Sequence, residues 1–217
     1  PPVELAFAFV IVFTISVILL PYIPVSAATN PEPVASVAPS VAPPVPVELN
    51  AYQVLDASFS TAIQRDLERR FYAELIGGSQ RKRIVEAIYA FAPDLNKDLV
   101  VAQLLQESKG NPYAHNENRD SKGRVTSVDR GLFQLNSRSY PKLSEDDFFN
   151  IEINVQYGTA HLRGELEHWD GNVRKALWTY NAGKGGISDG VPKRTLAYAD
   201  DIIEAAKSIS QQRLAYI

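Results

Sequence analysis

Residues 107–136 read ESKGNPYAHNENRDSKGRVTSVDRGLFQLN, and this stretch decides the fold more than any other part of the chain. It begins with a lone acidic residue, Glu107, directly after an apolar segment, and it becomes apolar again at Gly131. Between these points it is polar and rich in turn-forming residues, with a short β-prone run at 124–128. The pattern predicts a helix that ends near Glu107 and is followed by a small β-hairpin lobe.

The segment before Glu107 carries the start and stop signals of a helix. Asn96 is suited to cap the first turn and Asp98 favours that turn, because a helix N-terminus attracts acceptors and negative charge. Gly110 and Pro112 end the helix, because glycine favours the left-handed conformation found after helices and proline lacks a backbone donor. Glu107 is therefore expected in the last turn.

A glutamate in that position is suited to acid catalysis. The C-terminus of a helix carries a partial negative charge, which disfavours a second anion there. Val100, Gln103 and Leu104 share the helical face of Glu107, and burial of this face would also favour the protonated acid. Both effects raise the pKa of the carboxyl group, as a general acid at neutral pH requires. The alternative is an ordinary exposed glutamate near a helix end.

Four motifs occur in order between residues 80 and 210. They are Glu107-Ser108 with Asn111 to Ala114, Gly131 to Leu135, Thr179 to Gly183, and Pro192 to Tyr198. Together they resemble the catalytic domain of soluble-lytic-transglycosylase-type muramidases, within the lysozyme-like superfamily. The resemblance implies a mainly α (α+β) fold, in which a lysozyme-like domain carries a small β-hairpin lobe.

The resemblance also implies that Glu107 is the general acid and base of a glycan-cleaving enzyme and that Tyr198 orients it through its hydroxyl group. From the residues themselves, Gly131 would let the backbone approach a sugar closely, and a buried Gln134 amide needs a partner such as Glu107 or a substrate hydroxyl. Core packing is the alternative for the aromatic side chains. The supporting or substrate-binding positions that the resemblance implies are Ser108, Gly131, Phe133, Gln134, Tyr180, Asn181 and Tyr198.

Asp129 departs from the family pattern and leaves a second mechanism open. Residues 118–138 also resemble the β-lobe of animal-type lysozymes, in which an aspartate two residues before the glycine is the second catalytic carboxylate. With Glu107 alone, the resemblance implies a peptidoglycan lytic transglycosylase that cleaves the MurNAc-GlcNAc β-1,4 bond and leaves 1,6-anhydro-MurNAc ends. With Glu107 and Asp129 together, it implies a lysozyme-type hydrolase.

We favour the lyase, because the third and fourth motifs are those of transglycosylases. The structural alternative for Asp129 is a turn aspartate paired with Arg124, Arg130 or solvent. A non-catalytic glycan-binding module of the cell envelope is an alternative from another class. Glu107 argues against it, because binding alone has no use for an acid with a raised pKa.

Composition limits the other classes of function. The net charge of −3 gives no reason to expect nucleic acid. The partner that the resemblance implies is the peptidoglycan glycan strand. There is no cysteine, and His161 and His168 lie too far apart on one predicted helix to share an ion, so we expect no metal. The glycine-rich run at 183–186 follows a helix rather than a strand, so we expect no phosphate-bearing cofactor.

The N-terminal residues predict export. The run Leu5–Leu20 is uncharged and Val25-Ser26-Ala27 resembles a cleavage site, so residues 1–28 are expected to be a signal peptide or a membrane anchor through 5–20. Residues 29–49 are rich in proline and are expected to form a linker. Either alternative places the domain in the cell envelope or periplasm, membrane-anchored or secreted.

An amphipathic helix over 50–78 is expected ahead of the catalytic domain at 79–217. Such a helix needs a surface to pack against, which is either the catalytic domain or, through 52–75, another protein. Its apolar residues recur every four positions, at Leu55, Phe59, Ile63, Leu67, Phe71 and Leu75.

Two more helices are predicted within the catalytic domain. Gly77 and Gly78 break the amphipathic helix, and Ser79 is expected to start the next one, over 80–91. The fourth motif leads into a helix over 195–208, which carries Tyr198.

Overall fold

The computed structural model describes residues 51–217, and Glu48–Ile217 forms one compact unit. The expected signal or anchor segment at 1–28 and the linker at 29–49 lie outside the described residues. Among the helices that the structure does describe, none combines the length and apolar character that crossing a bilayer needs.

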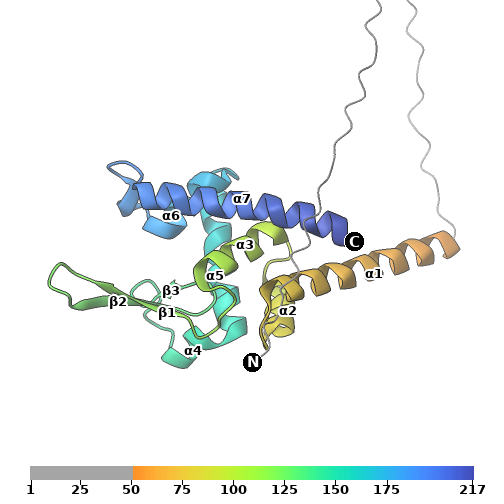
Figure 1. The fold of residues 1–217 in the computed structure, drawn as a ribbon, viewed down its shortest axis with the longest axis horizontal. Coiled ribbons are helices and arrows are strands. Elements are labelled where there is room, and N and C mark those ends of the chain that lie inside the picture. The colour runs from red at the N-terminus through yellow and green to blue at the C-terminus, as the bar shows by residue number, and fades with distance from the viewer. Residues whose placement is uncertain (1–50) are drawn as a thin grey trace, which may run out of the picture. The chain divides into compact units, whose positions relative to one another are not determined.

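Helices dominate the described part of the chain (Figure 1). The expectation of a mainly α fold with a small β-lobe is confirmed, because this part contains seven α-helices and three short strands. In chain order the elements are α1 (Ala51–Ile76), α2 (Arg81–Phe91), α3 (Lys97–Ser108), β1 (His115–Arg119), β2 (Val125–Arg130), β3 (Leu135–Asn136), α4 (Glu145–Phe149), α5 (Ile151–His168), α6 (Val173–Ala182), the short helix η1 (Gly185–Ile187) and α7 (Lys193–Tyr216).

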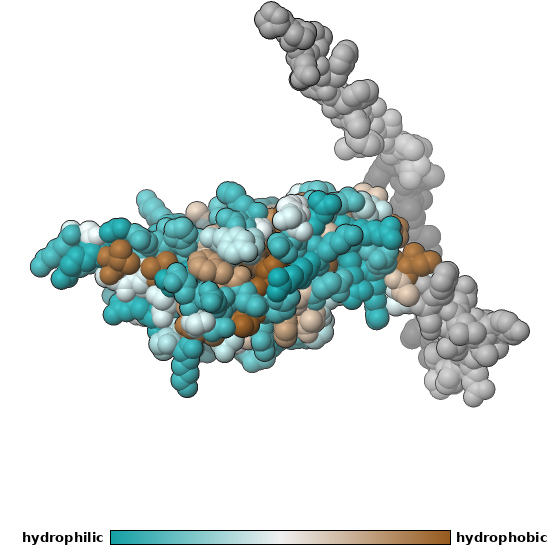
Figure 2. Space-filling model, turned by 90° about the horizontal axis from the view of Figure 1, so that it is seen from below, coloured by the Kyte–Doolittle hydropathy of each residue, from teal (hydrophilic) through white to brown (hydrophobic). Residues whose placement is uncertain are grey.

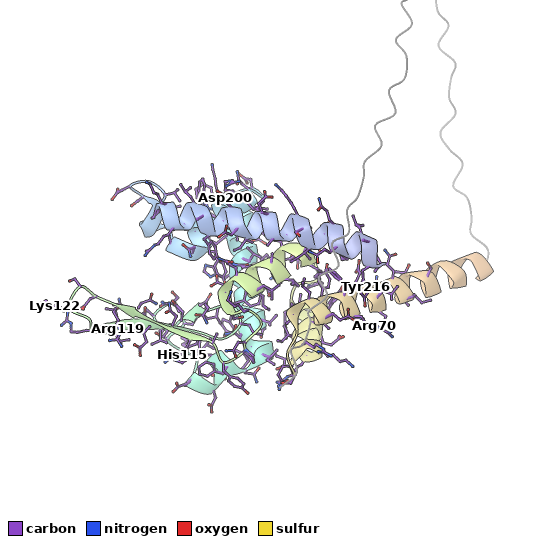
Figure 3. All side chains as sticks on the ribbon, in the orientation of Figure 1. Arg70, His115, Arg119, Lys122, Asp200 and Tyr216 are labelled. Carbon is purple, nitrogen blue, oxygen red and sulfur yellow. The ribbon has the colours of Figure 1, made fainter. Side chains whose placement is uncertain are left out.

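The β-lobe is a three-stranded antiparallel sheet in the order β1-β2-β3. Figure 3 shows its hairpin reaching away from the helices, with Lys122 at the tip. Asp129 in β2 lies opposite Asn116 in β1 and opposite Asn136 in β3. The prediction of a hairpin is confirmed. The sequence pattern does not predict β3, because two residues are too few to carry an alternating pattern.

Helix α3 runs through the core and carries Glu107 in its last turn, as predicted. The Asn96 side chain accepts a hydrogen bond of 3.0 Å from the backbone of Leu99, which confirms the predicted cap. Lys109 takes the left-handed conformation with φ of 53° and ends the helix just before Gly110. The buried residues of α3 include Val100, Val101, Ala102, Gln103 and Leu104.

Helix α7 packs along α3 and α6 and holds the C-terminal part of the chain against the core (Figure 1). It extends past both predicted ends, 195 and 208. The extension has a physical reason, because Ile209 is buried and Arg213 donates hydrogen bonds of 3.1 and 3.0 Å to the buried carboxylate of Asp98 in α3. These contacts stabilise the last turns of α7.

Among the side chains of α1 that the structure describes, from Ser60 on, the buried ones lie in the C-terminal turns. Phe71, Tyr72 and Ile76 are buried, and the Tyr72 hydroxyl donates a hydrogen bond of 2.8 Å to Asp98. Ile63, by contrast, is 47% exposed, so the predicted stripe does not form one continuous buried face. In a helix of 3.6 residues per turn, residues four apart are displaced by about 40° around the helix axis. A series with this spacing therefore winds around the helix and cannot stay in contact with one flat surface. A protein partner for the exposed part stays a prediction.

Helix α2 begins one residue later than predicted. It starts at Arg81 after Gln80, and no side chain caps it, so the expectation that Ser79 starts the helix is wrong. Gly77 and Gly78 both have positive φ, and Ser79 and Gln80 form the turn that follows them.

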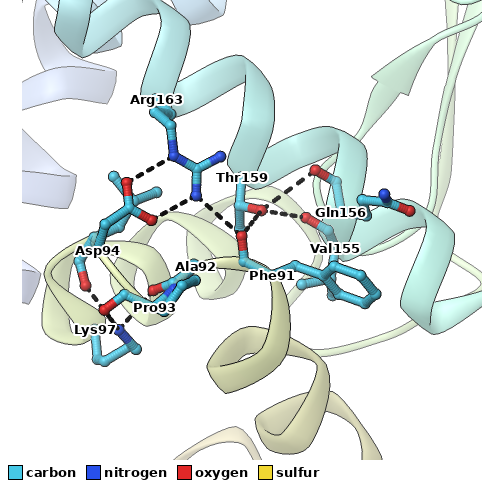
Figure 4. Close-up of polar contacts among 10 residues, drawn as sticks. Phe91, Ala92, Pro93, Asp94, Lys97, Val155, Gln156, Thr159 and Arg163 are labelled. Carbon is cyan, nitrogen blue, oxygen red and sulfur yellow. Dashed lines mark hydrogen bonds and ion pairs between the residues drawn. The ribbon is translucent and has the colours of Figure 1, made fainter.

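Helix α5 is tied to the connection that leads into α3 (Figure 4). Arg163 of α5 donates two hydrogen bonds of 2.7 Å to the carboxylate of Asp94 and one of 3.0 Å to the backbone carbonyl of Phe91. Lys97 donates to the backbone carbonyls of Ala92, Pro93 and Leu95 in the same connection. The start of α3 is therefore held from two sides.

The face of the molecule seen in Figure 2 is mainly hydrophilic, with hydrophobic residues in small groups.

Candidate active-site cleft

Glu107 stands where two adjoining hollows meet. The first hollow has a volume of about 470 Å³ and is bounded by the β-lobe, α5 and α6. The second has a volume of about 650 Å³ and lies between the β-lobe and the start of α7. Both hollows are open to solvent, so an extended ligand can lie across the glutamate from one to the other. The residues that line both are Glu107, Asn118, Asp129, Gln134 and Asn181.

The surroundings of Glu107 favour its protonated form. Burial is the main cause and raises the pKa of Glu107 to about 7, a hydrogen bond from Tyr198 opposes the rise, and the negative charge of Asp129 adds to it. The apolar residues beneath it on α3, such as Val100 and Leu104, are fully buried. A carboxyl group with a pKa near 7 can both donate and accept a proton at neutral pH.

Tyr198 orients Glu107 from the neighbouring helix. Its hydroxyl donates a hydrogen bond of 2.5 Å to Oε1 of Glu107 and accepts one of 3.3 Å from Nε2 of Gln103. Burial raises the pKa of Tyr198 well above its ordinary value, so the hydroxyl keeps its proton. Gln103 is buried on α3, one turn before Glu107. The three side chains form one chain of hydrogen bonds that ends at the carboxyl group.

Asp129 lies in the same cleft and is held by two amides. Asn118 donates a hydrogen bond of 2.8 Å to Oδ2 of Asp129, and Asn136 donates one of 2.7 Å to Oδ1. The alternative of a turn aspartate paired with Arg124 or Arg130 is wrong, because Arg124 binds Asp120 and Arg130 approaches Glu145. Sequence reasoning missed Asn118 and Asn136. Their places opposite the Asp129 strand become visible only once the register of the sheet is known.

Gly131 serves the packing of the protein rather than the approach of a sugar. It has φ of 77°, and a Cβ atom there would lie 2.2 Å from Nδ2 of Asn154 and 2.3 Å from the carbonyl oxygen of Phe148. Asn154 also binds the backbone of the second motif, accepting from Phe133 and donating to Arg130. Gly131 is buried and lines neither hollow, so the structure gives no support for the expected contact between Gly131 and a sugar.

Phe133 and Ser108 are likewise core residues. Phe133 is fully buried, and a Cβ atom at Gly158 of α5 would lie 2.3 Å from its ring. The Ser108 hydroxyl donates to the backbone carbonyl of Leu104, one turn earlier in α3. Neither residue lines the two hollows, so both support the cleft from behind.

Gln134 does line the cleft, but its amide donors are already occupied. Nε2 donates hydrogen bonds of 3.1 and 3.0 Å to the backbone carbonyls of Ala114 and Gly131. The expectation that Glu107 partners this amide is wrong, because its Nε2 already donates to these two backbone carbonyls. Its amide instead joins the second motif to the end of the first.

The third motif contributes one wall of the cleft. The Tyr180 hydroxyl donates a hydrogen bond of 3.1 Å to the backbone carbonyl of Phe133, and its ring stacks on His161 at 4.3 Å. Asn181 accepts a hydrogen bond of 2.9 Å from Thr195 and is exposed at the cleft edge. The structure thus brings Glu107, Asp129, Gln134, Tyr180 and Asn181 together, although they come from three separate parts of the chain.

Within the described residues, no three His, Asp or Glu side chains converge as a metal site requires. The chemistry that the cleft offers is that of a single acid with a raised pKa, a neighbouring carboxylate and aromatic walls.

Comparison with known proteins gives one family match. The family described as "Transglycosylase SLT domain" matches residues 86–197, which is more than half of the chain. Among solved structures, an inactive mutant of lytic transglycosylase Slt from Pseudomonas aeruginosa matches with 20% sequence identity and a TM-score of 0.43. The match covers 62% of this chain and 24% of that protein, so the chain spans about a quarter of its length.

Proposed function

Because the chain belongs to the transglycosylase SLT family, we propose that it is a peptidoglycan lytic transglycosylase that cleaves the β-1,4 bond between MurNAc and GlcNAc. The observation that carries the proposal is the position of Glu107. Its pKa is raised to about 7, and it stands between two hollows that an extended polymer can cross. A polymer cut within its length needs binding space on both sides of the acid.

The first step is protonation of the leaving group. Oε1 of Glu107 accepts the hydrogen bond from Tyr198, so Oε2 carries the acidic proton. That proton passes to the glycosidic oxygen, the bond from this oxygen to C1 of MurNAc breaks, and C1 becomes oxocarbenium-like. The Tyr198 hydroxyl then stabilises the Glu107 carboxylate that this transfer leaves behind.

The second step closes a ring within the same sugar. The C6 hydroxyl oxygen attacks C1, and Glu107 accepts the proton that this hydroxyl releases. The product end is 1,6-anhydro-MurNAc, no water is consumed, and Glu107 returns to its acid form ready for another cycle. One residue therefore acts first as acid and then as base, which suits a pKa near the working pH.

A lysozyme-type hydrolase is the second candidate, and the placement of Asp129 favours it. Asp129 shares both hollows with Glu107, and two amides fix its carboxylate. Two carboxyl groups in unlike surroundings, one desolvated and one hydrogen-bonded by polar groups, suit an acid and a second carboxylate that stabilises or captures C1. Water would then complete the reaction and leave a reducing end.

Replacement of the acid tests the proposal. Glu107→Gln keeps the shape of the side chain but cannot donate the proton, so a folded variant should lose release of soluble fragments from purified peptidoglycan. Glu167→Gln, an exposed position on α5, is the matched control and should retain full activity. Substantial cleavage by folded Glu107→Gln would remove Glu107 from its role. Absence of cleavage by the parent protein would favour the glycan-binding module instead.

We propose that the protein acts outside the cytoplasm, where peptidoglycan lies. The support is the substrate together with the uncharged run Leu5–Leu20 and the proline-rich residues 29–49. N-terminal sequencing of the mature protein, combined with fractionation, separates the cases. A start near Ala28 indicates a cleaved signal peptide, an intact N-terminus in membranes indicates an anchor, and an intact cytosolic chain contradicts export.

A further inference from the structure

We propose that Glu165, in the wall of the first hollow, is a sugar-binding residue that accepts a hydrogen bond from a hydroxyl or acetamido N–H group of the glycan. The inference rests on the proposed function and deepens it by assigning a binding contact away from Glu107. Glu165 lies on α5 and lines the first hollow only, together with Tyr140, His161 and Tyr180. The contact is therefore made with sugar on one side of the bond that is cut.

The carboxylate of Glu165 lacks a hydrogen-bond partner among the described residues. The side chain is 13% exposed, and Oε2 is buried with no partner. Oε1 lies 3.7 Å from Nε2 of His161, which is too long for a hydrogen bond. Most buried carboxylates are satisfied by several donors, so this one stands apart from the others in the fold, such as Asp98 with Tyr72 and Arg213.

His161 does not supply the missing partner at neutral pH. Its ring is stacked on Tyr180 at 4.3 Å and meets Tyr140 edge-on at 6.5 Å, which fixes its position. Burial lowers the pKa of His161, with Glu165 opposing the change, so the ring is neutral near pH 7. The ring at 3.7 Å makes no hydrogen bond to Glu165.

An unsatisfied buried carboxyl oxygen destabilises the folded protein, because a polar atom is removed from water without a new hydrogen bond. Glu165 lines the first hollow and Oε2 is its buried oxygen, so Oε1 is the oxygen that the hydroxyl and acetamido donors of a bound sugar would reach. The rings of Tyr140, His161 and Tyr180 form the adjacent wall, and such aromatic surfaces suit the C–H face of a pyranose. The surroundings therefore favour a neutral N-acetylated sugar unit as the occupant.

The test measures binding and stability in the same variants. Oligomers of β-1,4-linked N-acetylglucosamine are titrated calorimetrically into Glu107→Gln protein, which binds without turnover, and into the same protein carrying Glu165→Met. Methionine has a similar length but accepts no strong hydrogen bond. We expect the second variant to bind at least about fivefold more weakly, and to melt at a higher temperature because an unsatisfied buried oxygen is removed. Glu165→Gln, which retains an acceptor oxygen, should keep part of the affinity.

Glu167→Met on the exposed face of the same helix is the matched control and should change neither quantity. Equal affinity with and without Glu165 would overturn the inference, as would a lower melting temperature with unchanged binding, which indicates a structural role. The proposed function fails separately, through absence of peptidoglycan cleavage by the unmodified protein. Absence of oligosaccharide binding while Glu165 is intact would overturn the sugar site itself.

Discussion

Tyr198 donates a hydrogen bond of 2.5 Å to Oε1 of Glu107, although the two residues lie 91 positions apart in the chain. The bond joins the last turn of α3 to the first turns of α7, so the packing of these two helices also sets the position of the acid. It occupies Oε1 of the carboxyl group and, in the proposed mechanism, leaves Oε2 for the substrate.

Tyr198→Phe should therefore lower turnover by about 10–100-fold, because a hydrogen bond to a charged group contributes about 1.5–3 kcal/mol. This hydrogen bond lowers the pKa of Glu107, so its loss should move the alkaline limb of the pH–rate profile to higher pH. The measurement is kcat/KM on peptidoglycan across pH. Tyr216→Phe, an exposed tyrosine near the end of the same helix, should leave the profile unchanged.

Gln103 should act through Tyr198 and not independently of it. Gln103→Met removes the amide that donates to the Tyr198 hydroxyl, so turnover should fall by a few fold, about 0.5–1.5 kcal/mol for one neutral hydrogen bond. In a Tyr198→Phe background the same substitution should cost nothing further, because the accepting oxygen is absent. Equal losses in both backgrounds, measured as a double-mutant cycle, would show that the two residues are not coupled.

Because the pKa of Glu107 is raised, its ionised form should lower the free energy of unfolding at high pH. The folded pKa of about 7 exceeds the ordinary 4.5, so the stabilising contribution is complete below about pH 4.5 and is lost as pH rises through 7. The difference in free energy of unfolding between Glu107→Gln and the parent should therefore change by up to about 3 kcal/mol in favour of Glu107→Gln as pH rises from about 4.5 to about 8.5. Urea unfolding at the two pH values measures this, and an exposed change, Glu167→Gln, should show no such trend.

Two glycines with the same backbone conformation should respond differently to alanine. Gly123 and Gly131 have φ of 76° and 77°, but only at Gly131 would a Cβ atom meet neighbouring atoms, at 2.2 and 2.3 Å. Gly123→Ala should cost about 1 kcal/mol for the left-handed conformation alone. Gly131→Ala should cost more than about 3 kcal/mol, because Asn154 and the second motif must move. Similar unfolding free energies for the two variants would contradict the packing role of Gly131.

The helix that carries the acid could be predicted from sequence, because Asn96 and Gly110 mark its ends by local conformational preference. The hairpin was predictable for the same reason. The length of α7 was not, because it depends on the distant contact of Arg213 with Asp98. The start of α2 was not, because no side chain caps it. The period-four stripe of α1 could not show which surface it packs on, and among its side chains that the structure describes, Phe71 is buried whereas Ile63 is 47% exposed.

Within the site, motif position indicated Tyr198 and Tyr180, which line the second and the first hollow, and the structure gives their hydrogen bonds. It could not separate residues that face the cleft from those that support it from behind. Phe133 packs against Gly158 of α5, and Gly131 packs against Asn154 of α5 and Phe148 of α4. No local sequence pattern reveals these contacts. Asn118 and Asn136 reach Asp129 only through the strand register.

Digestion of purified peptidoglycan in water enriched in ¹⁸O, followed by mass spectrometry of the products, tests the central claim most directly. If Glu107 acts alone and the C6 hydroxyl attacks C1, the products should end in 1,6-anhydro-MurNAc, lighter by one water than a reducing end, and carry no ¹⁸O. Asp129→Asn should then retain activity within about tenfold of the parent. Reducing ends labelled with ¹⁸O, and lost together with activity in Asp129→Asn, would contradict the lyase and identify a two-carboxylate hydrolase.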